Sequence, residues 1–590
     1  MVTKGRDPRD VWAFVQRICG VCTSTHALAA LRSVEDALGI EIPKNANYIR
    51  NIMHSCLDVH DHIVHFYHLH ALDWVSPLEA LKADPAKTAA LQETVLKTYN
   101  LSGLEPAETQ STLSAYPKEF PKGDATYYGA VQAKVKKIVD SGQLGIFAAQ
   151  WWDHPDYQLL PPEVHLMGVA HYLNILDRQR DIVTPHVVFG GKNPHPHYTV
   201  GGMPCAISMD DMNAPINSAR LAVVDESISL AKDLVDYFYL PDVLAIGQIY
   251  VKAGMVDGGG LSKRRVLAYG GYPDEPYKNI HDGDYFQKSV VRASGVVEDF
   301  EKGVAAAKFT PLDGKTLMDP KFVSEEIEHS WYEYPSNTKS LNPSEGITKP
   351  NYTGPKTGTK EHWEYLDEAK KYSWIKSPTF QGKACEVGPL AKYIVVYTKV
   401  KQGILKNPTW AENMMVRQID TVSSVLGVPA HVWMCSTVGR TACRALDAQV
   451  AANMSRYFFN KLVTNIKNGD TSVANMKNFD PNTWPKEAKG VGILDAPRGA
   501  LGHWCVIKDG KIANYQCIVP TTWNACPRTM ANEHGAYESN MIDTKVKVPD
   551  KPLEILKGIH SFDPCLACAT HLYNKKGEEI VSVNTDALCK

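Results

Sequence analysis

Four cysteines stand in two Cys-x-x-Cys pairs near opposite ends of the chain, and a histidine follows each pair. The residues of this pattern are Cys19, Cys22 and His26 near the amino terminus, and Cys565, Cys568 and His571 near the carboxyl terminus. Thiolates are soft, electron-rich ligands, so four of them together suit zinc, copper(I), an iron–sulfur cluster or nickel. With 13 cysteines in 590 residues, one such pair could arise by chance. Two pairs, each with its histidine, predict a metal site.

The spacing leaves two kinds of metal site open. Zinc ribbons usually keep their two Cys-x-x-Cys pairs close in sequence, whereas almost the whole chain separates these two pairs. A zinc ion that joins the ends of a large protein is unusual but possible. On spacing alone, a redox metal and a structural zinc are equally open. A disulfide framework is disfavoured, because such frameworks belong to short secreted chains and the odd cysteine count leaves one thiol free.

An arginine that could serve a buried site lies between a proline and a glycine, in the order Pro497, Arg498, Gly499. A buried guanidinium needs carboxylate partners, and Asp61 and Asp563 are the candidates. The alternative is a surface turn with a solvated arginine, which is commoner in general. The two interpretations predict opposite burial for Arg498.

Two further motifs could suggest chemistry but are interpreted as structural. Six histidines crowd one segment: His54, His60, His62, His65, His68 and His70. Residues three or four positions apart share a helix face. We nevertheless expect these side chains to pack and form hydrogen bonds rather than bind metal. The glycine-rich segment 190–196 lacks the Gly-Lys-Ser/Thr ending of a phosphate-binding loop. It predicts a tight structural loop.

Composition places the chain among soluble globular proteins, with 44% hydrophobic and 22% charged residues. A net charge of -2 gives no reason to expect nucleic acid or an anionic membrane surface as a partner. No apolar run reaches the roughly 18 residues that suggest a membrane-spanning helix. The first residues contain no apolar core of a signal peptide. We therefore expect a cytoplasmic protein, or one exported on a partner that carries the signal.

The elements that position these residues are mainly helices. Apolar residues at helical spacing predict four long helices. The first ends near Leu38, and the other three span about 45–74, 215–239 and 445–466. Hydroxyl residues before the first are candidate N-caps, and Gly39 is its stop. Short apolar runs at 393–397 and 504–507 predict strands, the second with a hairpin turn at 508–511. Segment 320–382 predicts a packed, aromatic-rich loop. The fold class is α+β, mainly α: a central bundle of long helices with small peripheral sheets.

The sequence motifs around the cysteines resemble those of a known protein family. Segments 16–26 and 561–571 closely resemble the two signature motifs of the nickel–iron hydrogenase large subunit, as do 190–196, 386–391, 439–441 and 496–504. The resemblance covers the whole chain and is strongest to the respiratory, membrane-bound uptake branch. It implies the large-subunit fold, with residues 1–571 as one domain. It also implies that a maturation endopeptidase removes residues 572–590.

The resemblance assigns metal ligands to six residues: Cys19 and Cys565 as terminal nickel thiolates, Cys22 and Cys568 as thiolates bridging nickel to iron, and His571 and the backbone carbonyl of Cys517 as magnesium ligands. The iron would carry carbon monoxide and two cyanides. Around them, His26 would donate a hydrogen bond to a bridging sulfur. The canopy over the open metal position would comprise Arg498, Asp61, Asp563 and Pro497.

The implied activity is reversible, heterolytic cleavage of dihydrogen, mainly in the uptake direction. The proton would pass to Cys565 or Arg498, and the sequence does not choose between them. No further cysteines form an iron–sulfur array, so electrons would leave through an iron–sulfur small subunit and then a membrane cytochrome b. The resemblance places the protein at the periplasmic face of the membrane, exported with its small subunit.

Two departures from the family pattern stand out. The family carries an upstream region with a proton-gate glutamate and a magnesium-ligand glutamate, so we expect that Met1 is not the true start. Lys392 stands where the family usually has arginine. One relative of the same fold is a nickel-free quinone-site subunit of respiratory complex I. That alternative lacks the cysteine pairs, and a structural zinc protein is the second alternative.

Overall fold

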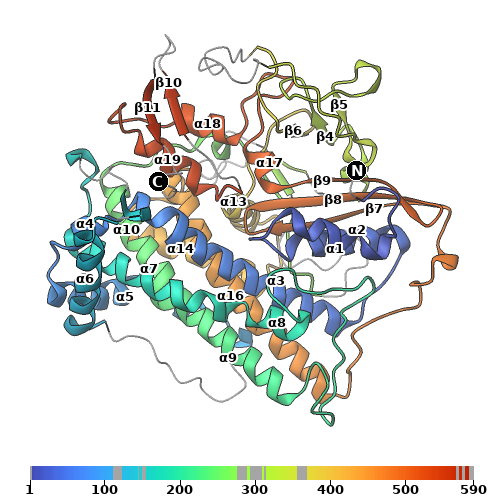
Figure 1. Ribbon diagram of the computed structural model, residues 1–590, viewed down its shortest axis with the longest axis horizontal. Coiled ribbons are helices and arrows are strands. Elements are labelled where there is room, and N and C mark those ends of the chain that lie inside the picture. Colours follow the sequence, from blue (N-terminus) through green and yellow to red (C-terminus); the bar gives the residue numbers. More distant parts are fainter. Residues whose placement is uncertain are drawn as a thin grey trace.

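The computed structural model describes residues 3–109, 123–143, 145–148, 154–274, 312, 314–354 and 369–565, and the backbone of 289–292, 308–310, 570–573 and 579–583. Seven long helices build its centre: α3 Lys44–Val64, α7 Pro162–Ile182, α9 Ser218–Leu234, α10 Leu240–Lys252, α13 Pro389–Lys401, α14 Trp410–Leu426 and α16 Thr437–Lys467. In Figure 1, α3, α7, α9 and α16 run side by side across the lower half of the molecule. The predicted mainly helical fold with a central bundle is confirmed.

The other described α-helices surround this bundle: α1 Val11–Val15, α2 Thr25–Leu38, α4 Pro77–Ala80, α5 Pro85–Tyr99, α6 Ala125–Asp140, α8 Thr184–Gly190, α12 Gly314–Met318, α15 Ala430–Trp433, α17 Pro520–Asn524, α18 Ala536–Ile542 and α19 Leu553–Ser561. Within the described ranges, no helix is both long and apolar enough to cross a membrane. Helix α16 lies at the centre, because its residues from Val438 to Arg456 are buried on every side.

The four predicted helices are present, with different ends. Helix α2 ends where expected, with Gly39 left-handed at φ 64°. Its predicted hydroxyl cap is wrong: Ser24 makes no cap hydrogen bond, and the Thr25 hydroxyl donates to the Cys22 carbonyl at 2.8 Å. Helix α3 continues through a π-helix at His65–His70 and a 3-10 turn at Ala71–Asp73.

The third and fourth helices are longer than predicted. Beyond α9, a π-helix at Val235–Tyr239 passes directly into α10, so the helical path runs on to Lys252. Helix α16 begins at Thr437, with the hydroxyl of Ser436 accepting the Gly439 amide. The sequence pattern missed this first part, because small and charged residues there interrupt the apolar repeat.

The predicted strand at 393–397 is wrong, since these residues lie in the middle of α13. Short apolar runs cannot be assigned to helix or strand by periodicity alone when both faces are buried. Residues Pro389 to Lys399 are all buried, so no polar face revealed the helical period. Pro389 at the first helical position, directly after Gly388, is the start signal that the apolar run obscured.

The predicted hairpin at 508–511 is confirmed. It joins β8 Gly499–Lys508 to β9 Lys511–Ile518, and β7 Glu487–Ala496 pairs with the other edge of β8. Asp509 and Gly510 both have positive φ, of 47° and 71°, as the tight primed turn of a two-residue hairpin requires. Helix α2 packs on this sheet. A Cβ at Gly492 would lie 2.1 Å from the Ala29 carbonyl oxygen, so only glycine permits this close approach.

The remaining strands form small sheets at the periphery. They are β1 Arg265–Ala268 with β2 Ser289–Arg292 and β3 Lys308–Thr310, β4 Val323–Glu326 with β5 Ser340–Leu341 and β6 Ser377–Phe380, and the pair β10 Thr570–Tyr573 with β11 Glu579–Val583. The predicted loop at 320–382 therefore contains a sheet. Its aromatic residues pack as expected, with the Trp331 and Trp374 rings 5.1 Å apart. Residues 355–368 lie outside the described residues.

Candidate active site

Cysteines from the two ends of the chain meet. The sulfur atoms of Cys19, Cys22 and Cys565 all lie within 4.8 Å of one another. Cys19 and Cys22 are held between a 3-10 turn at Gln16–Ile18 and α2, and Cys565 follows α19. Cys568 lies outside the described residues, and only the backbone of His571 is described, in β10.

The three thiols do not ionise independently. Hydrogen bonds from Cys22 and Cys565, helped by the charge of Arg498, lower the pKa of Cys19 to about 2. The hydrogen bond to Cys19 raises the pKa of Cys565 to about 12, and the pKa of Cys22 lies well above its usual value for the same reason. One thiolate is therefore stable, whereas a second needs further positive charge. A soft cation supplies that charge, so the donor set fits a thiolate-bound metal.

A buried arginine spans two carboxylates beside the thiols. Arg498 Nη1 donates to Asp61 Oδ2 at 3.1 Å, and Arg498 Nη2 lies 2.9 Å from Asp563 Oδ1. The three residues are 4%, 1% and 0% exposed, so the prediction of a buried Arg498 with these partners is confirmed. Burial alone would lower the pKa of Arg498, but Asp563 and Asp61 raise it well above its usual value. The guanidinium is thus permanently charged.

Comparison with known proteins agrees with this chemistry. The family model for nickel-dependent hydrogenases matches residues 1–571. The chain belongs to this family. It is 47% identical over 587 residues to the uptake hydrogenase large subunit of Rhizobium leguminosarum bv. viciae, and 46% identical over 588 residues to the hydrogenase-1 large chain of Escherichia coli K12. Each alignment covers 99% of this chain and 90% of the relative.

The fold has solved counterparts as well. The reduced Ni-Fe-Se hydrogenase from D. vulgaris Hildenborough superposes with a TM-score of 0.61 at 24% sequence identity, covering 96% of this chain and 90% of that one. Membership of the nickel-dependent hydrogenases makes this chain an enzyme that acts on dihydrogen with a nickel–iron active site. The predicted family is confirmed.

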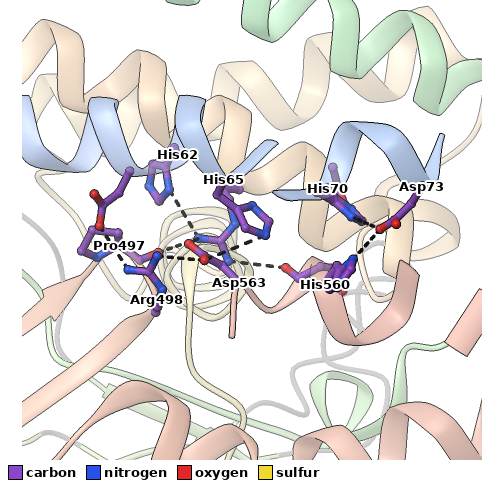
Figure 2. A network of polar contacts seen from close by, with 12 residues as sticks. His62, His65, His70, Asp73, Pro497, Arg498, His560 and Asp563 are labelled. Carbon is purple, nitrogen blue, oxygen red and sulfur yellow. Dashed lines mark hydrogen bonds and ion pairs between the residues drawn. The ribbon is translucent and has the colours of Figure 1, made fainter. Parts of the chain in front are cut away.

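The hydrogenase site has a second arginine that the sequence analysis missed. Arg444 Nη1 donates to the carbonyl oxygen of Pro497 at 2.7 Å and lies 3.4 Å from Asp563 Oδ2. Figure 2 shows Arg498 and Asp563 beside each other beneath His62 of α3 and His65 of the π-helix that follows it. Arg444 therefore fixes both Pro497 and one carboxylate of the canopy. No motif marks it, because its partners come from distant parts of the chain.

The helix positions of α3 decide what its histidines do. Hydrogen bonding is confirmed for four of the six: His54 with the Asp495 carbonyl, His60 with Gln179, His62 with Asp447, and His70 with Asp73. His65 differs, since neither ring nitrogen has a hydrogen-bond partner among the described residues. Its Nε2 lies 3.9 Å from Asp563 Oδ1. Burial holds the pKa of His65 well below its usual value, so the ring is neutral.

His26 stands in the first turn of α2, close to the thiols. Burial lowers the pKa of His26 to about 4, although the negative charge of Cys19 acts in the opposite direction. The imidazole is therefore neutral. Its Nδ1 lies 2.9 Å from Nε2 of His503 on β8. The structure thus places His26 within the electrostatic reach of the cysteines, as its predicted role requires.

Cys517 lies on β9, paired with His503 of β8. It lines a pocket of about 550 Å³ whose walls also include Arg17, Glu325 and Lys376. Lys376 Nζ lies 3.4 Å from Glu325 Oε2, and both are buried. The predicted magnesium ligand at the Cys517 carbonyl stays a prediction, because the His571 side chain lies outside the described residues.

Two of the motifs that resemble the family, 190–196 and 386–391, fix neighbouring segments of the site. His195, in the glycine-rich loop, places Nδ1 3.0 Å from the Thr23 hydroxyl, next to Cys22. Glu386 accepts both Nε and Nη2 of Arg440, at 2.7 and 3.0 Å. The loop at 190–196 is structural, as predicted. The second of these contacts fixes the start of α16, and with it the neighbouring Arg444.

Proposed function

We propose that this chain, the catalytic large subunit of a nickel–iron hydrogenase, cleaves dihydrogen heterolytically at a centre held by Cys19, Cys22, Cys565 and Cys568. The observation that carries the proposal is the meeting of three sulfurs from both chain ends beside Arg498. Four thiolates are needed to complete the pattern, and Cys568 follows Cys565 at the matching spacing. We assign residues 1–571 to one catalytic domain.

The residues around the thiols fit the groups that the family resemblance implies. Cys19 and Cys565 would hold nickel, while Cys22 and Cys568 would bridge it to an iron with carbon monoxide and two cyanides. When bound, the metals supply an open coordination position at which dihydrogen is polarised. His571 and the carbonyl of Cys517 would hold magnesium.

The protein's own groups organise the proton and exclude water. Arg498 holds a fixed positive charge beside the thiols, oriented by Asp61 and Asp563, and with Pro497 it would form the canopy over the metal centre. Its raised pKa makes the guanidinium a poor base. Cys565 Sγ is the remaining candidate of the two, because a thiolate has a lone pair that can take up a proton, whereas a protonated guanidinium has none. We therefore assign proton uptake to Cys565 Sγ and charge stabilisation to Arg498.

A large subunit works with a small subunit, and this chain has such a partner. We propose that it carries iron–sulfur clusters, which pass electrons to a membrane cytochrome b. We further propose that the pair acts at the periplasmic face of the membrane, and that an endopeptidase removes residues 572–590 after nickel insertion. Intact-mass measurement of the active chain tests the last point. An active chain that still ends at Lys590 would contradict it.

The deciding experiment is metal analysis of the purified large and small subunit complex, together with its hydrogen-oxidation rate. We expect one nickel and one iron in the dinuclear centre of each large subunit. Zinc at stoichiometric level without nickel would support the structural-zinc alternative instead. The complex I-like alternative is disfavoured because that relative lacks the cysteine pairs, and it predicts neither nickel nor hydrogen oxidation.

A further inference from the structure

Three side chains form a continuous hydrogen-bonded chain beneath α2. His26 Nδ1 lies 2.9 Å from His503 Nε2, and His503 Nδ1 lies 2.6 Å from the hydroxyl of Tyr515. His503 on β8 and Tyr515 on β9 are diagonal neighbours on one face of the sheet, since His503 pairs with Cys517 and Cys505 with Tyr515. His26 and His503 are 3% and 0% exposed. Bulk water therefore does not compete for these contacts.

The protonation states restrict this chain to two arrangements. Both imidazole rings are buried, and burial favours the neutral form of an imidazole. The phenol of Tyr515 keeps its hydrogen near pH 7, because an ordinary tyrosine ionises only at about pH 10. A neutral imidazole has one donor and one acceptor nitrogen. Each hydrogen bond therefore has one donor and one acceptor, and the direction of the hydrogen bond between His26 and His503 fixes the direction of the one between His503 and Tyr515.

In the first arrangement, Tyr515 donates to His503 Nδ1, and His503 Nε2–H donates to His26 Nδ1. His26 then carries its hydrogen on Nε2. In the second arrangement, His26 Nδ1–H donates to His503 Nε2, and His503 Nδ1–H donates to the Tyr515 oxygen. His26 Nε2 then carries no hydrogen and can only accept. The Ser33 hydroxyl also neighbours Tyr515, but it donates to the Ala30 carbonyl at 2.8 Å. The Ser33 oxygen can therefore accept from Tyr515 just as His503 Nδ1 can, so the contacts at Tyr515 allow both arrangements, and the charge at the other end of the chain decides between them.

The thiolate charge selects between the two arrangements. Because His503 occupies Nδ1 of His26, only Nε2 remains for the side of the cysteines. An N–H there directs a positive hydrogen into the field of the Cys19 thiolate, whereas a lone pair would face it with like charge. We propose that His503 and Tyr515 are positioning residues that fix His26 in the tautomer with Nε2–H available to the thiolate centre.

This assignment rests on the proposed function and adds two residues to it. A hydrogen bond to a thiolate withdraws electron density from the sulfur, and thus from any metal that the sulfur binds. Without it, the metal becomes more electron-rich and transfers more density into a bound carbonyl. Loss of the chain at His503 or Tyr515 should therefore change the electronic state of the centre without changing its ligands.

Infrared spectroscopy of the complete enzyme with its small subunit tests the assignment, because carbonyl and cyanide stretches report electron density directly. Tyr515→Phe removes the donor at the far end, and His503→Leu removes the link. We expect the carbonyl band of His503→Leu to move to lower wavenumber, and that of Tyr515→Phe to move the same way or split between two tautomers. We expect turnover to fall about 10-fold in His503→Leu, as is typical for a residue that orients a ligand partner.

A conservative variant and a matched control separate positioning from packing. His503→Gln can accept from Tyr515 and donate to His26, so we expect bands and turnover near those of the unaltered enzyme. Tyr332→Phe is the control. Tyr332 and Tyr515 line the same pocket as Cys517, but the Tyr332 hydroxyl donates to the Trp374 carbonyl. Its bands should not move.

Three results would overturn the assignment: Tyr515→Phe with unchanged bands, His503→Gln shifted as far as His503→Leu, or Tyr332→Phe shifted equally. Nickel content is measured for each variant, and if His503→Leu does not retain nickel, Tyr515→Phe decides alone. The proposed function fails separately, since an unaltered enzyme without nickel or carbonyl bands would refute it before any variant is made.

Discussion

Within the described ranges, two clusters bring three possible metal ligands within 4.8 Å of one another. One is the thiol cluster of Cys19, Cys22 and Cys565. The other is His70, Asp73 and His560, at the far end of the α3 path (Figure 2). Both gather residues from the α2–α3 region and from α19, so residue type and convergence do not distinguish them. Their hydrogen bonds do.

In the imidazole cluster, the ring nitrogens that face Asp73 and Trp74 already form hydrogen bonds. Asp73 Oδ2 lies 2.8 Å from His70 Nδ1 and 2.6 Å from His560 Nδ1, and His70 Nε2 accepts from Trp74 Nε1 at 3.1 Å. A metal on His70 Nδ1 would force a hydrogen onto Nε2, against the Trp74 donor. In the thiol cluster, a second thiolate lacks positive charge. The comparison teaches that unmet charge, more than ligand identity, marks a metal site.

The sharpest test of this comparison removes one ligand from each cluster. We expect Cys22→Ser to abolish nickel retention and hydrogen oxidation, because one of the proposed metal-binding thiolates is lost. We expect His560→Gln to retain full nickel content. Metal analysis of the purified complex measures both. Cys56→Ser, at another buried cysteine, is the control and should keep its nickel. Nickel loss in His560→Gln would show that the imidazole cluster also binds metal.

The second test concerns the canopy, where charge and geometry can be separated. Arg498→Lys keeps a positive charge but loses the planar fork that contacts Asp61 and Asp563 together. We expect unchanged nickel content and turnover lowered by about 100-fold, as when a preorganised donor is removed from an active site. Arg265→Lys, at the pair with Glu533 outside the site, should keep turnover near normal. Full activity in Arg498→Lys would exclude Arg498 from the chemistry.

The contrast also explains what the sequence could predict. The sequence predicts the cysteine motifs and Arg498 because a few adjacent residues indicate the chemistry of each. It predicts the buried carboxylates because a buried guanidinium needs such partners. The long helices followed from local periodicity. Arg444 and His503 could not be found this way, because their partners lie in segments that only folding brings together.

The wrong strand at 393–397 has a similar physical origin. A helix buried on every side has no polar face, so its apolar run carries no period. The same burial makes Lys392 notable. Its Nζ lies 2.7 Å from Asp447 Oδ1, and Asp447 in turn contacts His62. The lysine ammonium contacts both carboxylate oxygens of Asp447, at 2.7 and 2.9 Å, which explains how it serves where the family usually has the larger, forked arginine.

The smallest expected effect is the pH dependence of the imidazole cluster. Burial alone would lower the pKa of His560, but Asp73 raises it above its usual value, and the two imidazoles hold the pKa of Asp73 below its usual range despite burial. A raised histidine pKa stabilises the fold fully below the pKa of the unfolded chain. That contribution is lost as pH rises through the folded pKa. The Asp73 contribution is lost only in strong acid, as pH falls through its depressed value.

We therefore expect the melting temperature of the unaltered complex to exceed that of His560→Gln most at mildly acidic pH, with the difference shrinking as pH rises past the folded pKa of His560. The His560 side chain is 29% exposed, so solvent screening limits the effect to about 1 kcal/mol. Thermal unfolding of both complexes across this pH range measures it. His154→Gln, at a more exposed pair with Asp156, should show no such trend. A difference that is constant with pH would mean that His560 stabilises by packing alone, and that its proton is not committed to Asp73.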